Sequence, residues 1–171
     1  LGSKNTIYDG IPNYIKTDMD KNRFGSILVD KIANSIIKSP SSRFFLDRII
    51  YNGKILLLKD FVIPLSSDEI KIGYSNEQLN WAKQNEEYIW KYFIENELLF
   101  KTNDDLIDRF IIPAPFSKFY LEIDNESPGK IGQWIGWQIL RSFRKKNPTL
   151  KISEILKLSY EEIFKEANYK P

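Results

Sequence analysis

The polar residues that could most readily carry chemistry lie on an otherwise apolar segment, which the sequence predicts as a helix from Lys130 to Lys146. Gln133, Gln138 and Arg141 fall among tryptophans, isoleucines and glycines that fill every side of this helix as far as Phe143. A buried polar group without a partner costs about 1 to 3 kcal/mol, so each of the three needs a hydrogen bond. We expect a buried polar network that fixes the packing, with a binding site as the alternative.

Glu86 presents the same problem on a second expected helix. At 100° per residue this carboxylate falls in the middle of the apolar stripe of the segment from Ser75 to Leu99. Buried carboxylates are usually paired, so we expect Arg109 or Arg141 to be its partner and the polar network to include it.

The side of that helix opposite Glu86 carries Trp81, Tyr88 and Tyr92. These aromatic side chains either pack against another helix of the same domain or remain available to a partner protein.

The absence of two residue types limits the remaining chemistry. The 171 residues include no histidine and no cysteine, which excludes imidazole bases, thiolate nucleophiles, disulfides and the usual zinc, haem and iron-sulfur ligand sets. No GxSxG motif or phosphate-binding glycine loop occurs. Carboxylates at Asp47, Glu86, Glu122 and Asp124 leave a glycosidase pair open. Glu122, Asp124 and Glu126 are explained by the dipole of the following helix, with a calcium site as the weaker alternative because they lack the ordered spacing of a calcium loop.

Composition predicts one globular domain over residues 1–171. The 25 basic and 23 acidic residues are dispersed and give a net charge of +2, so no nucleic-acid partner is expected. No apolar run approaches the roughly 20 residues that span a bilayer. The chain starts at Leu1, and the segment from Leu1 to Pro12 resembles the middle of a loop. We therefore expect the C-terminal portion of a longer protein.

Period-2 alternation is nearly absent, so the predicted class is mainly α. Proline, serine and glycine divide the chain into helical blocks, and capping boxes are expected at Ser75 with Gln78 and at Ser159 with Glu162. Ser127 is the expected N-cap, with Pro128 in the first helical position, of the tryptophan-bearing helix. The expected helices cover residues 20–38, 42–59, a short turn within 66–73, 75–99, 103–109, 127–146, 153–158 and 159–167.

Two helix faces carry specific packing predictions. In the helix from Asp20 to Lys38 an apolar face about half the circumference wide is expected to be buried. It comprises Leu28, Ile32 and Ile36 together with Val29, Ala33 and Ile37. Gly132 and Gly136 lie four residues apart, which predicts close approach of another element to that helix, with a ligand crevice as the alternative.

Four long segments carry a family resemblance. They are NGKILLLKDFVIP (residues 52–64), GYSNEQLNWAKQNEEYIWKYFIENELLF (73–100), PAPFSKFYLEIDNESPGKIGQWIGWQILRSF (113–143) and the terminal EEIFKEANYKP. In this order they resemble the gliding-motility lipoprotein B family, GldB, of the Bacteroidota. The resemblance implies a non-catalytic lipoprotein of the cell envelope, anchored through a lipidated N-terminal cysteine that this chain lacks and exposed to the periplasm. It also implies other gliding-motility envelope proteins as partners, an association with type IX secretion, and no cofactor.

That family is in turn similar to HExxH-type zinc metallopeptidases. The implied fold is a helical array like the helical part of a zincin that has lost its metal site. On this resemblance, Asp30, Lys31 and Asn34 stand where the His, Glu and His of the metal helix would be, and Asn52 stands at the third-ligand position. Asp30 and Asn34 share a helix face, but a lysine replaces the general base and an amide replaces a good ligand.

In one alternative to the non-catalytic role, the protein is an enzyme. A divergent metal-dependent hydrolase could bind a hard metal through carboxylates such as Asp30, Glu86 and Asp124. Absence of stoichiometric metal and of peptidase activity in the purified, chelator-free protein would remove this alternative.

Overall fold

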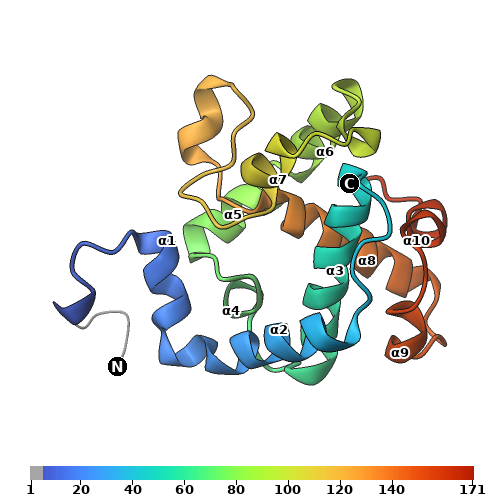
Figure 1. The fold of residues 1–171 in the computed structure, drawn as a ribbon, viewed down its shortest axis with the longest axis horizontal. Coiled ribbons are helices and arrows are strands. Elements are labelled where there is room, and N and C mark those ends of the chain that lie inside the picture. The colour runs from blue at the N-terminus through green and yellow to red at the C-terminus, as the bar shows by residue number, and fades with distance from the viewer. Residues whose placement is uncertain (1–5) are drawn as a thin grey trace.

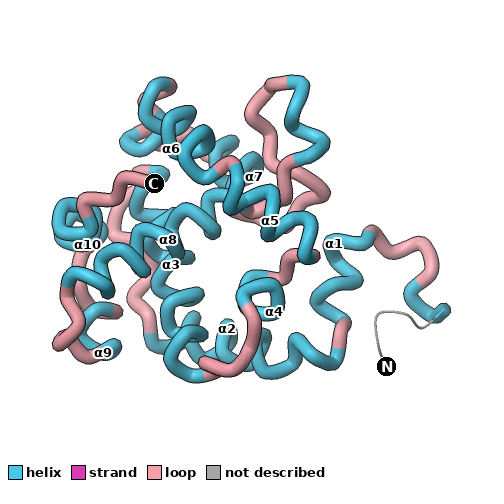
Figure 2. Tube along the Cα trace, turned by 180° about the vertical axis from the view of Figure 1, so that it is seen from behind, coloured by secondary structure: helices cyan, strands magenta, loops and turns pink. Residues whose placement is uncertain are grey.

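The computed structural model describes residues 6–171, and within them the chain is helical without a strand (Figures 1 and 2). Short 3-10 turns occur at Thr6–Tyr8, Thr17–Met19, Lys21–Arg23, Leu98–Phe100 and Glu122–Glu126. The α-helices are α1 (Asn13–Lys16), α2 (Phe24–Ile36), α3 (Phe45–Val62), α4 (Asp68–Ile72), α5 (Asn76–Gln84), α6 (Glu86–Glu95), α7 (Asp105–Phe110), α8 (Ile131–Lys146), α9 (Ile152–Ile155) and α10 (Tyr160–Ala167). The mainly α class is confirmed. The loop expected over Leu1–Pro12 lies partly outside the described residues.

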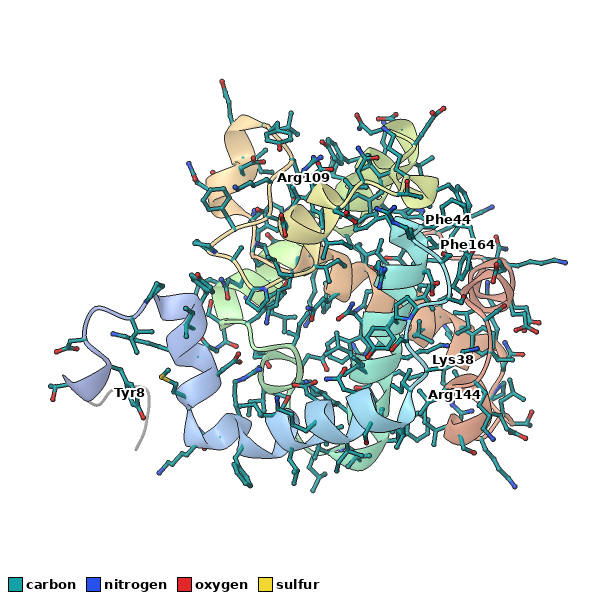
Figure 3. The ribbon with its side chains drawn as sticks, in the orientation of Figure 1. Tyr8, Lys38, Phe44, Arg109, Arg144 and Phe164 are labelled. Carbon is teal, nitrogen blue, oxygen red and sulfur yellow. The ribbon has the colours of Figure 1, made fainter. Side chains whose placement is uncertain are left out.

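Helices α3 and α8 form the centre of the fold, and the others surround them (Figures 1 and 3). Both are apolar on nearly every side, as their sequences predict, and Phe45 of α3 and Trp134, Trp137 and Phe143 of α8 are fully buried, whereas Phe61 near the end of α3 is 40% exposed. Buried aromatic rings join α3 to α6 and α7, since Phe45 contacts Phe93 and Phe93 contacts Phe110, and Trp134 and Trp137 pack edge-to-face within α8.

The glycines of α8 allow close helix contacts, as predicted. A Cβ at Gly136 would collide with the carbonyl oxygen of Ile49 in α3, and one at Gly53 would collide with the backbone of Gly136. A Cβ at Gly132 would lie 2.8 Å from the carbonyl oxygen of Phe110. The packing explanation therefore accounts for both glycines of α8.

Helix α2 buries only half of the face predicted for it. Val29, Ala33 and Ile37 pack with residues of α3 in a small second core. Leu28, Ile32 and Ile36 are instead 50%, 46% and 59% exposed, so that part of the prediction is wrong. The reason is that α2 lies along one edge of the molecule, where α3 covers one side of it (Figure 1).

The helix predicted from Ser75 to Leu99 is two helices. The capping box of Ser75 and Gln78 is present, but α5 ends at Gln84 and α6 begins at Glu86. Asn85 separates them with φ −105° and ψ 9°, and its side-chain amide donates to the carbonyl oxygen of Trp81 at 2.9 Å. An asparagine that bonds the backbone in this way competes with the helical hydrogen bonds, and a pattern of apolar residues does not reveal it.

Helix α8 begins at Ile131 rather than at the predicted N-cap Ser127. Lys130 precedes it with φ +61°, a left-handed conformation that is not helical, so the helix starts at the next residue. The hydroxyl of Ser127 instead donates to the carbonyl oxygens of Ser117 and Asp124, which fastens the preceding loop. The predicted end of this helix, Lys146, and the capping box at Ser159 are both confirmed.

Candidate functional site

A cavity of about 220 Å³ lies where α2, α3 and the start of α8 meet. Asp30 and Asn34 reach it from successive turns of α2, and Asn52 reaches it from α3. The structure therefore brings together three of the four positions that the metallopeptidase resemblance selected. The fourth, Lys31, is an exposed residue of α2 and does not line the cavity.

An ammonium group lies against the one carboxylate among these positions. Nζ of Lys59 is 2.7 Å from Oδ1 of Asp30, and it also donates to the carbonyl oxygen of Lys71 at 2.7 Å. Lys59 is 2% exposed. Its burial lowers the pKa of this lysine, and the charge of Asp30 opposes that shift. The cavity thus contains a fixed cation beside Asp30.

The two amides that the metallopeptidase resemblance placed at ligand positions make other hydrogen bonds. Oδ1 of Asn34 accepts a hydrogen bond from the hydroxyl of Tyr51 at 2.8 Å. Nδ2 of Asn52 donates to the carbonyl oxygen of Arg48 at 2.9 Å, within its own helix. Residues of α3 therefore orient both amides, and the two amides do not share a hydrogen-bond partner.

Two further cations line the cavity. Arg23, 6% exposed, donates through Nη2 to Oδ1 of Asp18 at 2.7 Å and through Nη1 to the carbonyl oxygen of Ile70 at 2.8 Å. Lys130 donates to the carbonyl oxygen of Ile72 at 2.9 Å. Burial, followed by the charge of Arg23, lowers the pKa of Lys130 to about 8.

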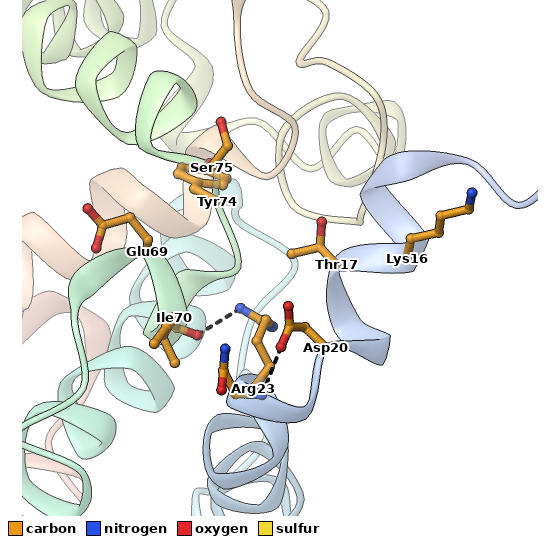
Figure 4. Close-up of a pocket in the computed structure, with 9 residues that line it drawn as sticks. Lys16, Thr17, Asp20, Arg23, Glu69, Ile70, Tyr74 and Ser75 are labelled. Carbon is orange, nitrogen blue, oxygen red and sulfur yellow. Dashed lines mark hydrogen bonds between the residues drawn. The ribbon is translucent and has the colours of Figure 1, made fainter. Parts of the chain in front are cut away.

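A neighbouring hollow shares Arg23 with this cavity (Figure 4). Its volume is about 420 Å³, and its other lining residues come from the segment before α2 and from the region of α4 and α5. In the close-up Arg23 points from the α2 side toward the carbonyl oxygen of Ile70. The guanidinium therefore connects the two sides of the hollow.

The predicted polar network takes a different form. Arg141 bonds both oxygens of Asp60 at 2.9 Å and both oxygens of Asp68 at 2.8 Å. Lys71 and the indole of Trp137 also donate to Asp60, each at 2.9 Å. Two cations and two carboxylates balance here, and the paired acids raise the pKa of Arg141 despite its burial. This network joins α3, α4 and α8.

Glu86, Gln133 and Gln138 lie outside that network. Glu86 accepts from the hydroxyl of Tyr169 at 2.6 Å, so neither arginine that we expected is its hydrogen-bond partner. Burial raises the pKa of this carboxyl, and the bond from Tyr169 opposes the rise. Gln133 donates to the carbonyl oxygen of Ile111 at 2.6 Å and lines the cavity. Nε2 of Gln138 is buried without a partner among the described residues.

Comparison with known proteins decides the family. The model of the family described as gliding motility protein GldB matches residues 1–171, the full length of the chain. The chain belongs to the GldB family. No curated protein and no solved structure matches it. The family is one of gliding motility lipoproteins, which makes this protein a membrane-anchored component of the cell envelope. Within residues 6–171, no helix combines the length and the apolar character needed to cross a bilayer.

In this member of the GldB family the aromatic face of α5 and α6 lines a separate groove. Trp81, Tyr88 and Tyr92 surround a volume of about 310 Å³ together with apolar residues of the loop before α8. Tyr88 is 72% exposed. Trp81 is partly buried against the main core, and the hydroxyl of Tyr92 donates to the carbonyl oxygen of Phe119 at 2.7 Å. The face thus combines packing at Tyr92 with a free aromatic surface at Tyr88.

The acidic residues that left other chemistry open have structural partners. Asp124 accepts from the backbone amides of Phe119 and Tyr120, each at 2.9 Å, and Asp47 accepts from the amide of Ser42 at 2.8 Å. No group of three or more acidic side chains within residues 6–171 is arranged to hold a metal ion. In this GldB-family chain Asp30, Glu86 and Asp124 therefore form no such group within the described residues.

The roles of several residues of the cavity and of the Arg141 network were not predicted from the sequence. Lys54 and Lys59 stand inside the apolar run of α3, and both are buried. A lysine in a helix predicted to be interior is the signal that could have found Lys59, because a buried ammonium needs an acceptor. Asp60 directly follows it. Lys130 had no such signal, since its role depends on the left-handed backbone before α8.

Proposed function

We propose that the protein is a non-catalytic scaffold of the gliding motility machinery and its associated type IX secretion apparatus. It would be exposed to the periplasm and would bind other envelope proteins of that machinery. Membership of the GldB family supports the setting, and the cavity beside Asp30 supports the absence of catalysis. The distant likeness to zinc metallopeptidases is part of this proposal.

The observation that carries the proposal is the ion pair of Lys59 and Asp30. A peptidase-like site needs a divalent cation, anionic or imidazole ligands and a general base. Here the ammonium of Lys59 lies 2.7 Å from Asp30, so a divalent cation bound by this carboxylate would meet a like charge at short range. The other positions of the former metal site carry Asn34 and Asn52, whose amides are weak ligands.

The aromatic groove supports a role in protein interaction. Protein interfaces are enriched in tryptophan and tyrosine, and Trp81, Tyr88 and Tyr92 line one groove of the domain. The ring of Tyr88, which the described residues leave 72% exposed, provides apolar area for a partner. We propose this groove as a contact surface for another envelope protein.

Colony spreading of a gliding bacterium that carries this protein tests the non-catalytic role. The double substitution Asp30→Asn with Lys59→Met removes both charges of the ion pair and preserves their similar volumes. We expect spreading and protein level to remain near those of the wild type. Loss of spreading at a normal protein level, together with peptide hydrolysis by the purified wild type that the double variant lacks, would overturn the proposal.

A further inference from the structure

The charges that line the cavity do not balance. Arg23, Lys59 and Lys130 contribute three cations, and Asp18 and Asp30 contribute two carboxylates. The carboxylates are committed, because Asp18 pairs with Arg23 and Asp30 pairs with Lys59, each at 2.7 Å. No ion pair within residues 6–171 includes Lys130. The cavity therefore holds one excess positive charge, and that charge belongs to Lys130.

The ammonium of Lys130 is only partly satisfied. It donates to the carbonyl oxygen of Ile72 at 2.9 Å, and it lies 5.7 Å from the centroid of the Tyr74 ring. A lysine has three donors, and the carbonyl oxygen uses one of them. The left-handed backbone at residue 130, with φ +61°, places this side chain directly before the first turn of α8. The positive end of that 16-residue helix adds to the attraction for an anion.

A second donor of the cavity wall also lacks a partner. Nε of Arg23 is buried and makes no hydrogen bond to a described residue. Arg23 itself is 6% exposed, and the ion pair with Asp18 holds its guanidinium in place. Buried donors without acceptors are rare in folded proteins, and an unfilled ligand or water position is one of the explanations for them.

The size and the neighbours of the cavity limit the ligand. Its volume of about 220 Å³ compares with about 30 Å³ for a water molecule in the liquid, so a carboxylate with a small substituent fits. Lys130 and Pro113 also line an adjoining hollow of about 270 Å³, which includes Gly129 and Tyr74. A ligand held at Lys130 therefore has room to extend in a second direction.

We propose that this cavity binds a single carboxylate group, with Lys130 as its charge partner. One carboxylate cancels the excess charge, whereas a phosphate dianion would leave the cavity negative. The carboxylate belongs either to the end of a polypeptide chain or to a small organic acid, since both present the same group. This binding goes beyond the scaffold role and does not depend on it.

Paired ligands that differ only in charge test the proposal on the full chain. We would record the backbone amide signals of residues 129–133 and of Asn52 by NMR while adding N-acetylalanine or, separately, N-acetylalanine amide. The acid should shift these signals in a saturable manner, and the amide should not. Acetate and inorganic phosphate are added in separate titrations. If acetate binds as tightly as N-acetylalanine does, the natural ligand is a small acid. If N-acetylalanine binds more tightly than acetate, the natural ligand is the end of a polypeptide chain.

Substitutions at Lys130 provide the second arm. Lys130→Met should weaken binding of N-acetylalanine by about tenfold or more, since it removes a charge-assisted hydrogen bond. Lys130→Arg keeps the charge, and Lys145→Met removes an exposed lysine from the other end of the same helix, so both should bind nearly as the wild type does. Equal binding of the acid and the amide, tighter binding of phosphate, or unchanged affinity in Lys130→Met would overturn the proposal. The comparison of ligands on the wild type needs no variant to fold.

Discussion

Nζ of Lys59 lies 2.7 Å from Oδ1 of Asp30, and this ion pair connects α3 to α2 across the wall of a cavity. Asp30 retains about a third of its side-chain exposure, whereas the side chain of Lys59 retains 3%. The lysine is therefore the member that depends on the pair, because its charge has left water almost completely.

Removal of one partner should cost more than removal of both. Asp30→Ala leaves the buried ammonium of Lys59 without a counter-charge, and we expect a loss of about 2 kcal/mol in the free energy of unfolding. Asp30→Asn combined with Lys59→Met should cost less than about 1 kcal/mol, since an apolar side chain of similar length replaces the charge. Urea denaturation of both variants measures the difference. A double variant less stable than Asp30→Ala would show that the pair itself stabilises the fold.

Adjacent residues of α2 should respond differently to truncation. Val29 is 3% exposed within the second core, and Leu28 is 50% exposed. Val29→Ala should destabilise the protein by about 1 to 2 kcal/mol, and Leu28→Ala should do so by less than about 0.5 kcal/mol although it removes more atoms. Thermal unfolding of the two variants gives the comparison. Similar losses would mean that the exposed side of α2 is covered in solution.

Helix α2 also shows what the sequence can and cannot predict. The apolar repeat located the helix, but Leu28, Ile32 and Ile36 satisfy it as well as Val29, Ala33 and Ile37 do. Only the position of α2 at the edge of the fold decides which set is buried. A pattern within one segment carries no information about how many neighbours that segment will have.

The candidate site likewise has one part that the sequence predicts and another part that it does not. Asp30, Asn34 and Asn52 could be grouped from the family resemblance and helical spacing, and they line one cavity. The partners of Arg141 could not be found, because Asp60 and Asp68 belong to α3 and α4, which lie more than 70 residues away along the chain. Long-range pairing of charges depends on the tertiary fold, and the sequence shows only that Arg141 needs an acceptor.

The Arg141 network should set the sensitivity of the protein to acid. Asp68 is subject to opposing effects: burial raises its pKa, but the bonds and charge of Arg141 outweigh this and leave the pKa lowered. A carboxyl whose folded pKa is depressed contributes stability above its unfolded pKa, and that stability disappears as pH falls through the folded value. Asp68→Asn should therefore lower the melting temperature at neutral pH and lose most of this effect in strong acid. Melting curves across that range measure it.

A matched acidic residue provides the control. Asp104 pairs with Arg43 on the surface, where the two side chains are 89% and 68% exposed. Exposed pairs contribute little, so Asp104→Asn should leave the melting temperature nearly unchanged throughout the same pH range. An equal effect of the two substitutions would show that general charge, rather than the network, determines the acid response.

Substitutions in the aromatic groove should distinguish interface residues from core residues. Tyr88→Ser removes a ring that is 72% exposed, and we expect it to change stability by less than about 0.5 kcal/mol. Tyr92→Ser removes the bond to the carbonyl oxygen of Phe119 and the ring packed against Phe119, so a loss of about 2 to 4 kcal/mol is expected. If the groove contacts a partner, Tyr88→Ser should reduce colony spreading while the protein level stays normal.

Substitution of Trp81 gives a further check on this face. Trp81 is partly buried against the main core and lines the groove, so the variant that combines Trp81→Ser with Tyr88→Ser tests both roles. Cooperative melting of this variant would identify the face as an interface, and loss of cooperative melting would identify it as core.

Lys130 should make the folded state less stable at neutral pH than at mildly alkaline pH. Burial lowers its pKa from 10.5 to about 8, so between these values the unfolded chain binds the proton and the folded protein does not. The free energy of unfolding then rises with pH across this window, by at most about 3 kcal/mol. The lowered pKa of Lys59 acts in the same direction, and the raised pKa of Tyr169 acts against it only where tyrosine ionises in the unfolded chain, near the top of the window.

Lys130→Met should remove most of this slope and should not destabilise the protein at neutral pH. The lost hydrogen bond to the carbonyl oxygen of Ile72 is offset because the charge no longer has to be buried. Urea denaturation of the wild type and of Lys130→Met at neutral pH and near pH 9 measures both effects, with Lys145→Met as an exposed control. A large loss of stability in Lys130→Met at neutral pH would assign Lys130 to the fold. An unchanged or higher stability would mean that the charge at Lys130 is kept for a ligand, since a residue that costs stability is typical of a binding site.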